Sequence, residues 1–275
     1  MTRWTRLEHL WDSVTKKAST TRYAANPKKR YKIGDGRSLL NVQTPVARYS
    51  TVSSGGPRLV SRIVLRMTAT QAPWFSALAP YVERDDLVVE LANPFLRPTG
   101  ERVDMLPSVF MRFPMWRGEP FADDMGKKTA AMIDLDGEHL FAELAILRLL
   151  ERDGWEGRWI HTTSKGEIST YLTDWRNVSR QEQRSRPIQH DGARALLYAI
   201  ADRSGNRYNG CWSLFAWREN SYAFFEAKRQ NAKEKESLKP AQAAWVRAAL
   251  SLRQQLMTAR DFCLVQWEYK TGTGD

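Results

Sequence analysis

A glutamate and a lysine two positions apart, Glu226 and Lys228, are the pair of charged residues in this sequence best suited to chemistry. A carboxylate supplies the hard oxygen ligands that Mg²⁺ or Mn²⁺ takes, and a nearby ammonium group can polarise water or neutralise charge that develops on phosphorus. A Glu-x-Lys pair also occurs often by chance, as a plain ion pair that adds little stability. Which interpretation holds depends on the strands and helices that position the pair.

The residues before this pair predict a covered strand that ends in charge. In 222–228, Phe224, Glu226 and Lys228 share one face, and small or aromatic apolar residues occupy the other. A strand that is apolar on both faces belongs inside a sheet, so its terminal charges converge at the sheet's end. Residues 213–217 predict the partner strand of a hairpin.

Two further polar residues are predicted on the apolar sides of helices. Asp136 suits the N-cap of a helix that ends before Gly154, and in it Glu143 has leucine and isoleucine at every helical neighbour position. A carboxylate that faces a core needs a metal ion, a lysine or main-chain donors, unless it lies at the boundary and reaches water. Gln242 occupies a similar position in a helix that begins near Pro240.

These segments, in this order, resemble the PD-(D/E)xK nuclease superfamily and, within it, the VRR-NUC (virus-type replication-repair nuclease) domain. The resemblance covers residues 130–270 and implies an α/β (α+β) fold, with a restriction-endonuclease-like mixed central sheet flanked by helices and a β-rich region before it. Five short segments carry the resemblance: 142–144, 210–217, 225–228, 242–245 and 265–267.

The resemblance implies a metal-dependent nuclease that hydrolyses phosphodiester bonds, with DNA as the expected substrate and Mg²⁺ or Mn²⁺ as the cofactor. Glu226 would bind the metal, together with the carbonyl of Ala227, and Glu143 would complete the acidic cluster from its helix. Lys228 would position or activate the attacking water, and Gln242 would orient water or phosphate.

One position departs from the family. Ser213 stands where the family carries an aspartate before an apolar strand, and a neutral hydroxyl is a weak metal ligand. Three explanations remain open. Another acid joins the site, with Asp174 and Asp202 the nearest in sequence; catalysis runs weakly on the two glutamates alone; or the domain is a pseudo-nuclease that binds nucleic acid or protein.

The net charge of +11 favours a polyanionic partner, with nucleic acid ahead of an anionic membrane. Residues 1–55 hold 11 Lys and Arg against 3 Asp and Glu, which predicts a basic arm along phosphates or, equally, a solvated tether. Residues 56–125 predict a small β-rich subdomain of unknown role, and 126–275 the nuclease-like domain. The expected phosphate contacts are Lys28, Lys29, Arg30, Lys32, Arg229, Lys233 and Lys235.

Two cysteines, Cys211 and Cys263, are too few for a disulfide-dense scaffold or a cysteine-based zinc module, and both are interpreted as small core residues. The 4 histidines have no metal-ligand spacing. The sequence also lacks a signal-peptide pattern and a long apolar run, so we expect a cytoplasmic protein without a membrane partner. The oligomeric state is left open.

Overall fold

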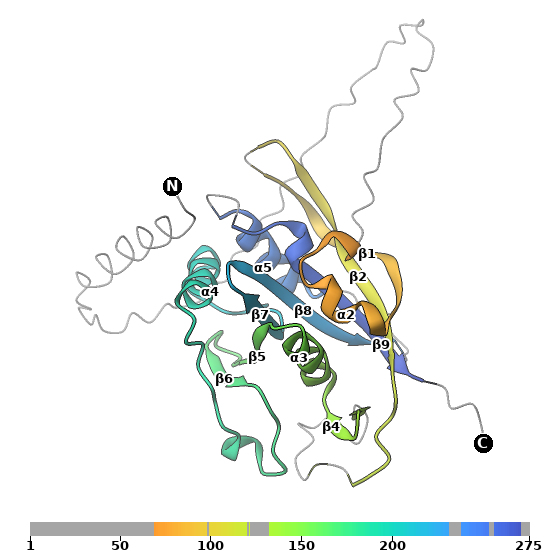
Figure 1. Ribbon diagram of the computed structural model, residues 1–275. Helices are drawn as coiled ribbons and strands as arrows, with labels where there is room; N and C mark the ends of the chain where they lie inside the picture. Colours follow the sequence, from red (N-terminus) through yellow and green to blue (C-terminus); the bar gives the residue numbers. More distant parts are fainter. Residues whose placement is uncertain are drawn as a thin grey trace, which may run out of the picture. The chain divides into compact units, whose positions relative to one another are not determined.

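The computed structural model describes residues 69–97, 99–119, 121, 132–230, 238–252 and 256–270 (Figure 1). The chain divides into two units, Met1–Leu65 and Arg66–Asp275, and all described residues belong to the second. The predicted basic arm, with Lys28, Lys29, Arg30 and Lys32, lies outside the described residues, as do Lys233 and Lys235.

The strands in this part of the chain are β1 (Val82–Leu96), β2 (Arg102–Phe113), β3 (Ile133–Leu135), β4 (Glu138–Leu140), β5 (Glu156–Thr162), β6 (Ile168–Leu172), β7 (Leu214–Arg218), β8 (Ser221–Arg229) and β9 (Phe262–Tyr269). The helices are α2 (Phe75–Leu78), α3 (Ala142–Arg152), α4 (Asp191–Arg203) and α5 (Pro240–Leu250), with short 3₁₀ helices at Ala69–Gln71, Ala79–Tyr81, Arg180–Glu182 and Ala259–Asp261.

Seven of the strands form one mixed sheet in the order β1-β2-β9-β8-β7-β5-β6. β9 is parallel to both of its neighbours, β2 and β8, whereas the β7–β8 and β5–β7 pairs are antiparallel. The predicted hairpin is confirmed as β7 and β8, and β8 lies inside the sheet as its apolar faces indicate. The sheet carries helices on its two faces, so the expected mixed α/β architecture is confirmed.

The two faces of β8 pack against different helices (Figure 1). Ala223 and Phe225 belong to the core cluster that includes the apolar side of α3. Phe224 belongs to the cluster with α4 and α5, where its ring stacks on Phe215 at a centroid distance of 4.5 Å and on Phe262 at 5.4 Å. By strand alternation, the side chains of residues 226 and 228 lie on this second face, beyond the aromatic stack.

The helix expected from Asp136 begins later than predicted. Asp136 and Gly137 both have positive φ, of 56° and 87°, and form the turn between β3 and β4. Asp134 Oδ1 accepts a hydrogen bond from the Gly137 N–H at 2.8 Å, so the Asp-Gly pair serves a hairpin instead of a helix cap. α3 starts at Ala142 and ends as predicted, with Gly154 in the left-handed conformation at φ 78°.

The β-rich region predicted for residues 56–125 is not a separate subdomain where the structure describes it. β2 pairs with β9 in parallel from Ser108↔Leu264 to Phe113↔Tyr269, so β1 and β2 extend the main sheet. The physical reason is burial: Val109 and Met111 are completely buried in the same core cluster as α3. The alternation of residues 58–70 also predicts a strand; positions up to 68 lie outside the described residues, and Ala69 and Thr70 begin a 3₁₀ helix instead.

In the part of the chain that the structure describes, no helix has the length and apolar character needed to cross a membrane.

Candidate functional site

Glu226 and Lys228 meet where β8 continues past the end of its antiparallel partner. β8 pairs with β7 up to Phe225, which lies opposite Leu214, whereas its pairing with β9 runs on to Arg229. Glu226 Oε1 lies 3.3 Å from Lys228 Nζ, and the two side chains are 11% and 10% exposed. The pair is therefore a nearly buried ion pair inside the sheet, not the solvated surface pair of the simpler interpretation.

Ser213, which precedes β7, reaches the same carboxylate. Its N–H donates a hydrogen bond to Glu226 Oε2 at 3.0 Å, so both oxygens of Glu226 are held by the protein. The Ser213 hydroxyl is buried and has no hydrogen-bond partner among the described residues. A buried hydroxyl without a partner is costly, because it has lost its water and gained nothing in return. The N–H of the same residue bonds to Glu226, so a ligand or cation held by that carboxylate would have this hydroxyl as a further oxygen nearby.

The start of α5 closes one side of the site through Gly210. This residue has φ +80°, and a Cβ atom there would lie 2.0 Å from the carbonyl oxygen of Ala241. The loop that leads to Ser213 therefore lies directly on the first turn of α5, at a distance that only glycine permits.

Gln242 is buried in this first turn, as its place on the apolar side of the helix predicts. Its Oε1 accepts a hydrogen bond from the Lys239 N–H at 3.0 Å and so caps its own helix. The structure thus gives Gln242 a local role that does not require a substrate.

Cys211 is a neighbour of the site that the sequence interpretation missed. It is half-buried, unlike Cys263, which is a core residue as expected. Burial and the nearby negative charge of Glu226 raise the pKa of Cys211 well above its ordinary value. The sulfur is therefore held as a thiol, which donates to the Trp212 carbonyl at 3.5 Å and is not set up as a nucleophile. Its position two residues before Ser213 was the available signal.

The other acids named from the sequence lie elsewhere. Glu143 is in the first turn of α3, which packs on the opposite face of the sheet from Glu226, and its partial exposure fits the alternative of a boundary residue that reaches water. Asp174 lies 3.7 Å from Arg186 in an ion pair, and Asp202 is exposed on α4. Within the described ranges, no group of three or more His, Cys, Asp or Glu side chains is arranged to hold a metal ion.

The oxygen donors at the site are few, but they fit a divalent cation. Glu226 supplies one carboxylate, the Ser213 hydroxyl is an oxygen without a partner, and Ala227 lies between the two charged residues, beyond the last residue that pairs with β7. Mg²⁺ is commonly held by one or two carboxylates, with water and substrate phosphate oxygens completing its shell. These residues match that pattern, with Ser213 contributing no charge.

Arg229, one of the expected phosphate contacts, is held by aromatic rings. Its guanidinium lies 4.5 Å from the ring centroid of Tyr269 and 5.6 Å from that of Trp267. Alternation places its side chain on the opposite face of β8 from Glu226 and Lys228. Arg229 is thus separated from the candidate site by the sheet itself.

Comparison of the chain with models of protein families, with curated proteins and with solved structures found no match.

Proposed function

We propose that this chain is a metal-dependent nuclease that hydrolyses phosphodiester bonds, with DNA as substrate, at the site formed by Glu226, Lys228 and Ser213. The observation that carries the proposal is the buried Glu226–Lys228 pair beside a buried hydroxyl that has no partner among the described residues. A fold gains little from burying such groups, whereas a site that binds a phosphate and its counter-ion uses all of them.

The architecture supports the proposal. A mixed central sheet flanked by helices is what the resemblance to the PD-(D/E)xK superfamily implies, and the Glu226–Lys228 pair lies near the end of β8, the middle strand of such a sheet. The Glu226 and Lys228 side chains share one face of β8, and Ser213 approaches them from the neighbouring strand.

Each residue of the site has a defined role in this proposal. The Ser213 N–H fixes the orientation of the Glu226 carboxylate, which would hold Mg²⁺ or Mn²⁺ together with the Ala227 carbonyl. A bound cation would lower the pKa of water and neutralise charge on the phosphate. Lys228 contributes an ammonium group whose one ion-pair partner within the described residues is Glu226, so its other donors are available to water or phosphate.

The test is a plasmid-nicking assay in Mg²⁺ or Mn²⁺, with EDTA as the metal-free control. Glu226→Gln and Lys228→Met are expected to abolish cleavage. Because each single change leaves one buried partner alone, the double variant Glu226→Gln/Lys228→Met serves as the control for folding: it should recover stability and remain inactive. Cleavage by the folded double variant at the wild-type rate would overturn the proposal.

A second candidate function is a pseudo-nuclease that binds nucleic acid without cutting it. The observation in its favour is the neutral Ser213 beside a single carboxylate, where the family carries an aspartate. Binding of DNA without cleavage in Mg²⁺ or Mn²⁺ would favour this alternative.

A further inference from the structure

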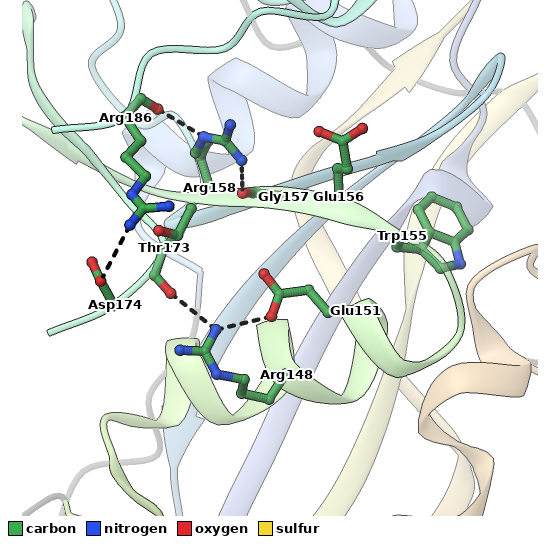
Figure 2. Close-up of a pocket in the computed structure, with 9 residues that line it drawn as sticks. All are labelled: Arg148, Glu151, Trp155, Glu156, Gly157, Arg158, Thr173, Asp174 and Arg186. Atoms are coloured by element: carbon green, nitrogen blue, oxygen red, sulfur yellow. Dashed lines mark hydrogen bonds and ion pairs between the residues drawn. The ribbon is translucent and has the colours of Figure 1, made fainter.

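A pocket of about 450 Å³ lies at the edge of the sheet, where β6 separates from β5 (Figure 2). β6 pairs with β5 from Trp159↔Leu172 onward, so the first residues of β5, 156–158, have β7 on one side and no strand on the other. The pocket opens at this notch. The pocket lies beside the first residues of β5. Ser213 contacts the same strand farther along, where its carbonyl accepts a hydrogen bond from the Ile160 N–H.

Three arginines from three different elements line the pocket: Arg148 from α3, Arg158 from β5 and Arg186 from the segment that leads to α4 (Figure 2). Arg148 is neutralised by two carboxylates, Glu138 at 3.2 Å and Glu151 at 2.9 Å. Arg148 therefore has no charge to offer a ligand.

Arg158 is different, because no carboxylate lies within ion-pair distance of it among the described residues. Its Nε donates to the Arg186 carbonyl at 2.7 Å and its Nη1 to the Gly157 carbonyl at 2.6 Å, which leaves Nη2 without a partner in the described part of the chain. The guanidinium lies 5.3 Å from the ring centroid of Trp217. This arginine is held in place by neutral groups, and the nearby carboxylates of Glu156 and Glu151 offset its charge only partly, because neither forms an ion pair with it.

The guanidinium of Arg186 adds a second positive charge at the same opening. Its ion pair with Asp174 is loose, at 3.7 Å, and both side chains are well exposed. Burial lowers the pKa of Arg158, and the proximity of Arg186 acts in the same direction, against the opposing effects of Glu156 and Glu151. Two cations close together, one of them half-buried, are stabilised by an anion between them.

We infer that this pocket binds a phosphodiester group of a nucleic-acid backbone through Arg158 and Arg186. The inference rests on the proposed function and adds a second contact with the substrate, away from the Glu226–Lys228 pair. Three carboxylates also line the pocket, those of Glu151, Glu156 and Asp174, and their negative charges disfavour a multiply charged anion. A phosphodiester, with a single negative charge, matches the one unpartnered nitrogen of Arg158 and the charge of Arg186 better than a doubly charged terminal phosphate does.

The test compares Arg158→Gln and Arg186→Gln with Arg84→Gln. Arg84 is a matched control, because it lies in β1 at the other edge of the sheet and is exposed in a similar loose ion pair, 3.6 Å from Asp86. Binding of a labelled single-stranded oligonucleotide and of its duplex is measured in EDTA by fluorescence anisotropy over a range of salt. Thermal melts accompany the measurement, because Arg158 also bonds to main-chain carbonyls.

Each pocket variant is expected to weaken binding several-fold and to reduce the slope of log K against log salt by about 0.9 on duplex or about 0.7 on a single strand. Arg84→Gln should leave the slope unchanged. Pocket variants that behave like Arg84→Gln, in a protein that still cuts DNA in Mg²⁺ or Mn²⁺, would overturn the pocket inference alone. A wild-type protein that neither binds nor cuts DNA would overturn both proposals.

Discussion

The Glu226–Lys228 pair and the arginine pocket, which is lined by Arg148, Arg158 and Arg186, are two charged clusters in one sheet. They differ in their exposure to solvent. The pair lies inside the sheet with side chains 11% and 10% exposed, whereas the side chains of the Arg186–Asp174 pair are 56% and 36% exposed. Each cluster nevertheless leaves one group without a partner among the described residues, the Ser213 hydroxyl in the first and Arg158 Nη2 in the second.

The difference shows that the free-energy cost of an unpartnered polar group depends on whether water reaches it. Water still reaches part of the half-buried Arg158 guanidinium, so its unpartnered Nη2 costs less free energy than a polar group that is sealed from solvent. Water does not reach the buried hydroxyl of Ser213 in the same way. The free-energy cost of removing this hydroxyl from water therefore destabilises the folded state. The buried cluster is therefore the more demanding one to maintain, which favours a role in chemistry for it and a role in anchoring for the pocket.

The largest expected effect is the difference in the free energy of unfolding that is lost when each cluster loses its carboxylate. Glu226→Gln leaves the Lys228 ammonium buried without its counter-ion and should lower the free energy of unfolding by about 3 kcal/mol or more. The equivalent change in the pocket, Asp174→Asn, should cost less than about 1 kcal/mol, because that pair is exposed. Urea unfolding of both variants checks this, and equal losses would contradict the distinction between buried and exposed clusters.

The next effect concerns the close approach that shapes the buried cluster. Gly210→Ala places a Cβ 2.0 Å from the Ala241 carbonyl in a left-handed conformation, and should cost about 3 kcal/mol. Gly205→Ala is the matched control, since its φ is +75° with no atom within 4 Å, and should cost only the conformational penalty of about 1 kcal/mol. Thermal melts of the two variants measure the difference. Similar melting temperatures would show that the loop moves away from α5 freely.

A third, smaller effect tests the buried cluster for cation binding. Ser213→Asp adds a carboxylate beside Glu226 and should lower the stability of the metal-free protein by about 1 kcal/mol through like-charge repulsion. Added Mn²⁺ should restore that loss and raise Tm by several degrees, because the ion binds only the folded state. Ser213→Asn is the neutral control and should show no such response. A Tm of Ser213→Asp that Mn²⁺ leaves unchanged would argue against a cation at this position.

The smallest expected change in stability belongs to Ser213→Ala. Removing a buried hydroxyl that has no partner in the described part of the chain should leave the free energy of unfolding within about 0.5 kcal/mol of wild type or raise it slightly. Metal-dependent cleavage should nevertheless fall, since the residue that loses its oxygen is the one whose N–H bonds to Glu226. A combined melt and nicking assay decides the point: a clear loss of stability would mean that the hydroxyl has a structural partner.

The elements nearest the site were predictable because their signals are local. The hairpin of β7 and β8 followed from alternation and a short turn, and α5 from Pro240 in its first turn. The nearness of Ser213 to Glu226 followed from the hairpin register alone. The start of α3 was wrong because Asp136-Gly137 can cap a helix or turn a hairpin, and only the pairing of β3 with β4 selects the second.

Other features depended on contacts between distant segments. No local pattern indicates that β2 pairs with β9, or that Gly210 touches Ala241. The arginine pocket required the divergence of β6 from β5, which places Arg186 beside Arg158. Gln242 is a different case, because its bond to the Lys239 N–H spans only three residues, and this local capping pattern was missed although its polar character was noticed.

The position of β9 has a consequence for synthesis on the ribosome. β9 lies between β2 and β8, and its Leu264 carbonyl accepts a hydrogen bond from Ser108, 156 residues earlier in the chain. The last strand of the described fold to be translated is therefore the one that joins the two halves of the sheet. Until it emerges, the nascent chain exposes the unpaired edges of β2 and β8, which a chaperone or a second strand could occupy. The completed sheet, and with it the environment of Lys228, forms only after β9 has been synthesised.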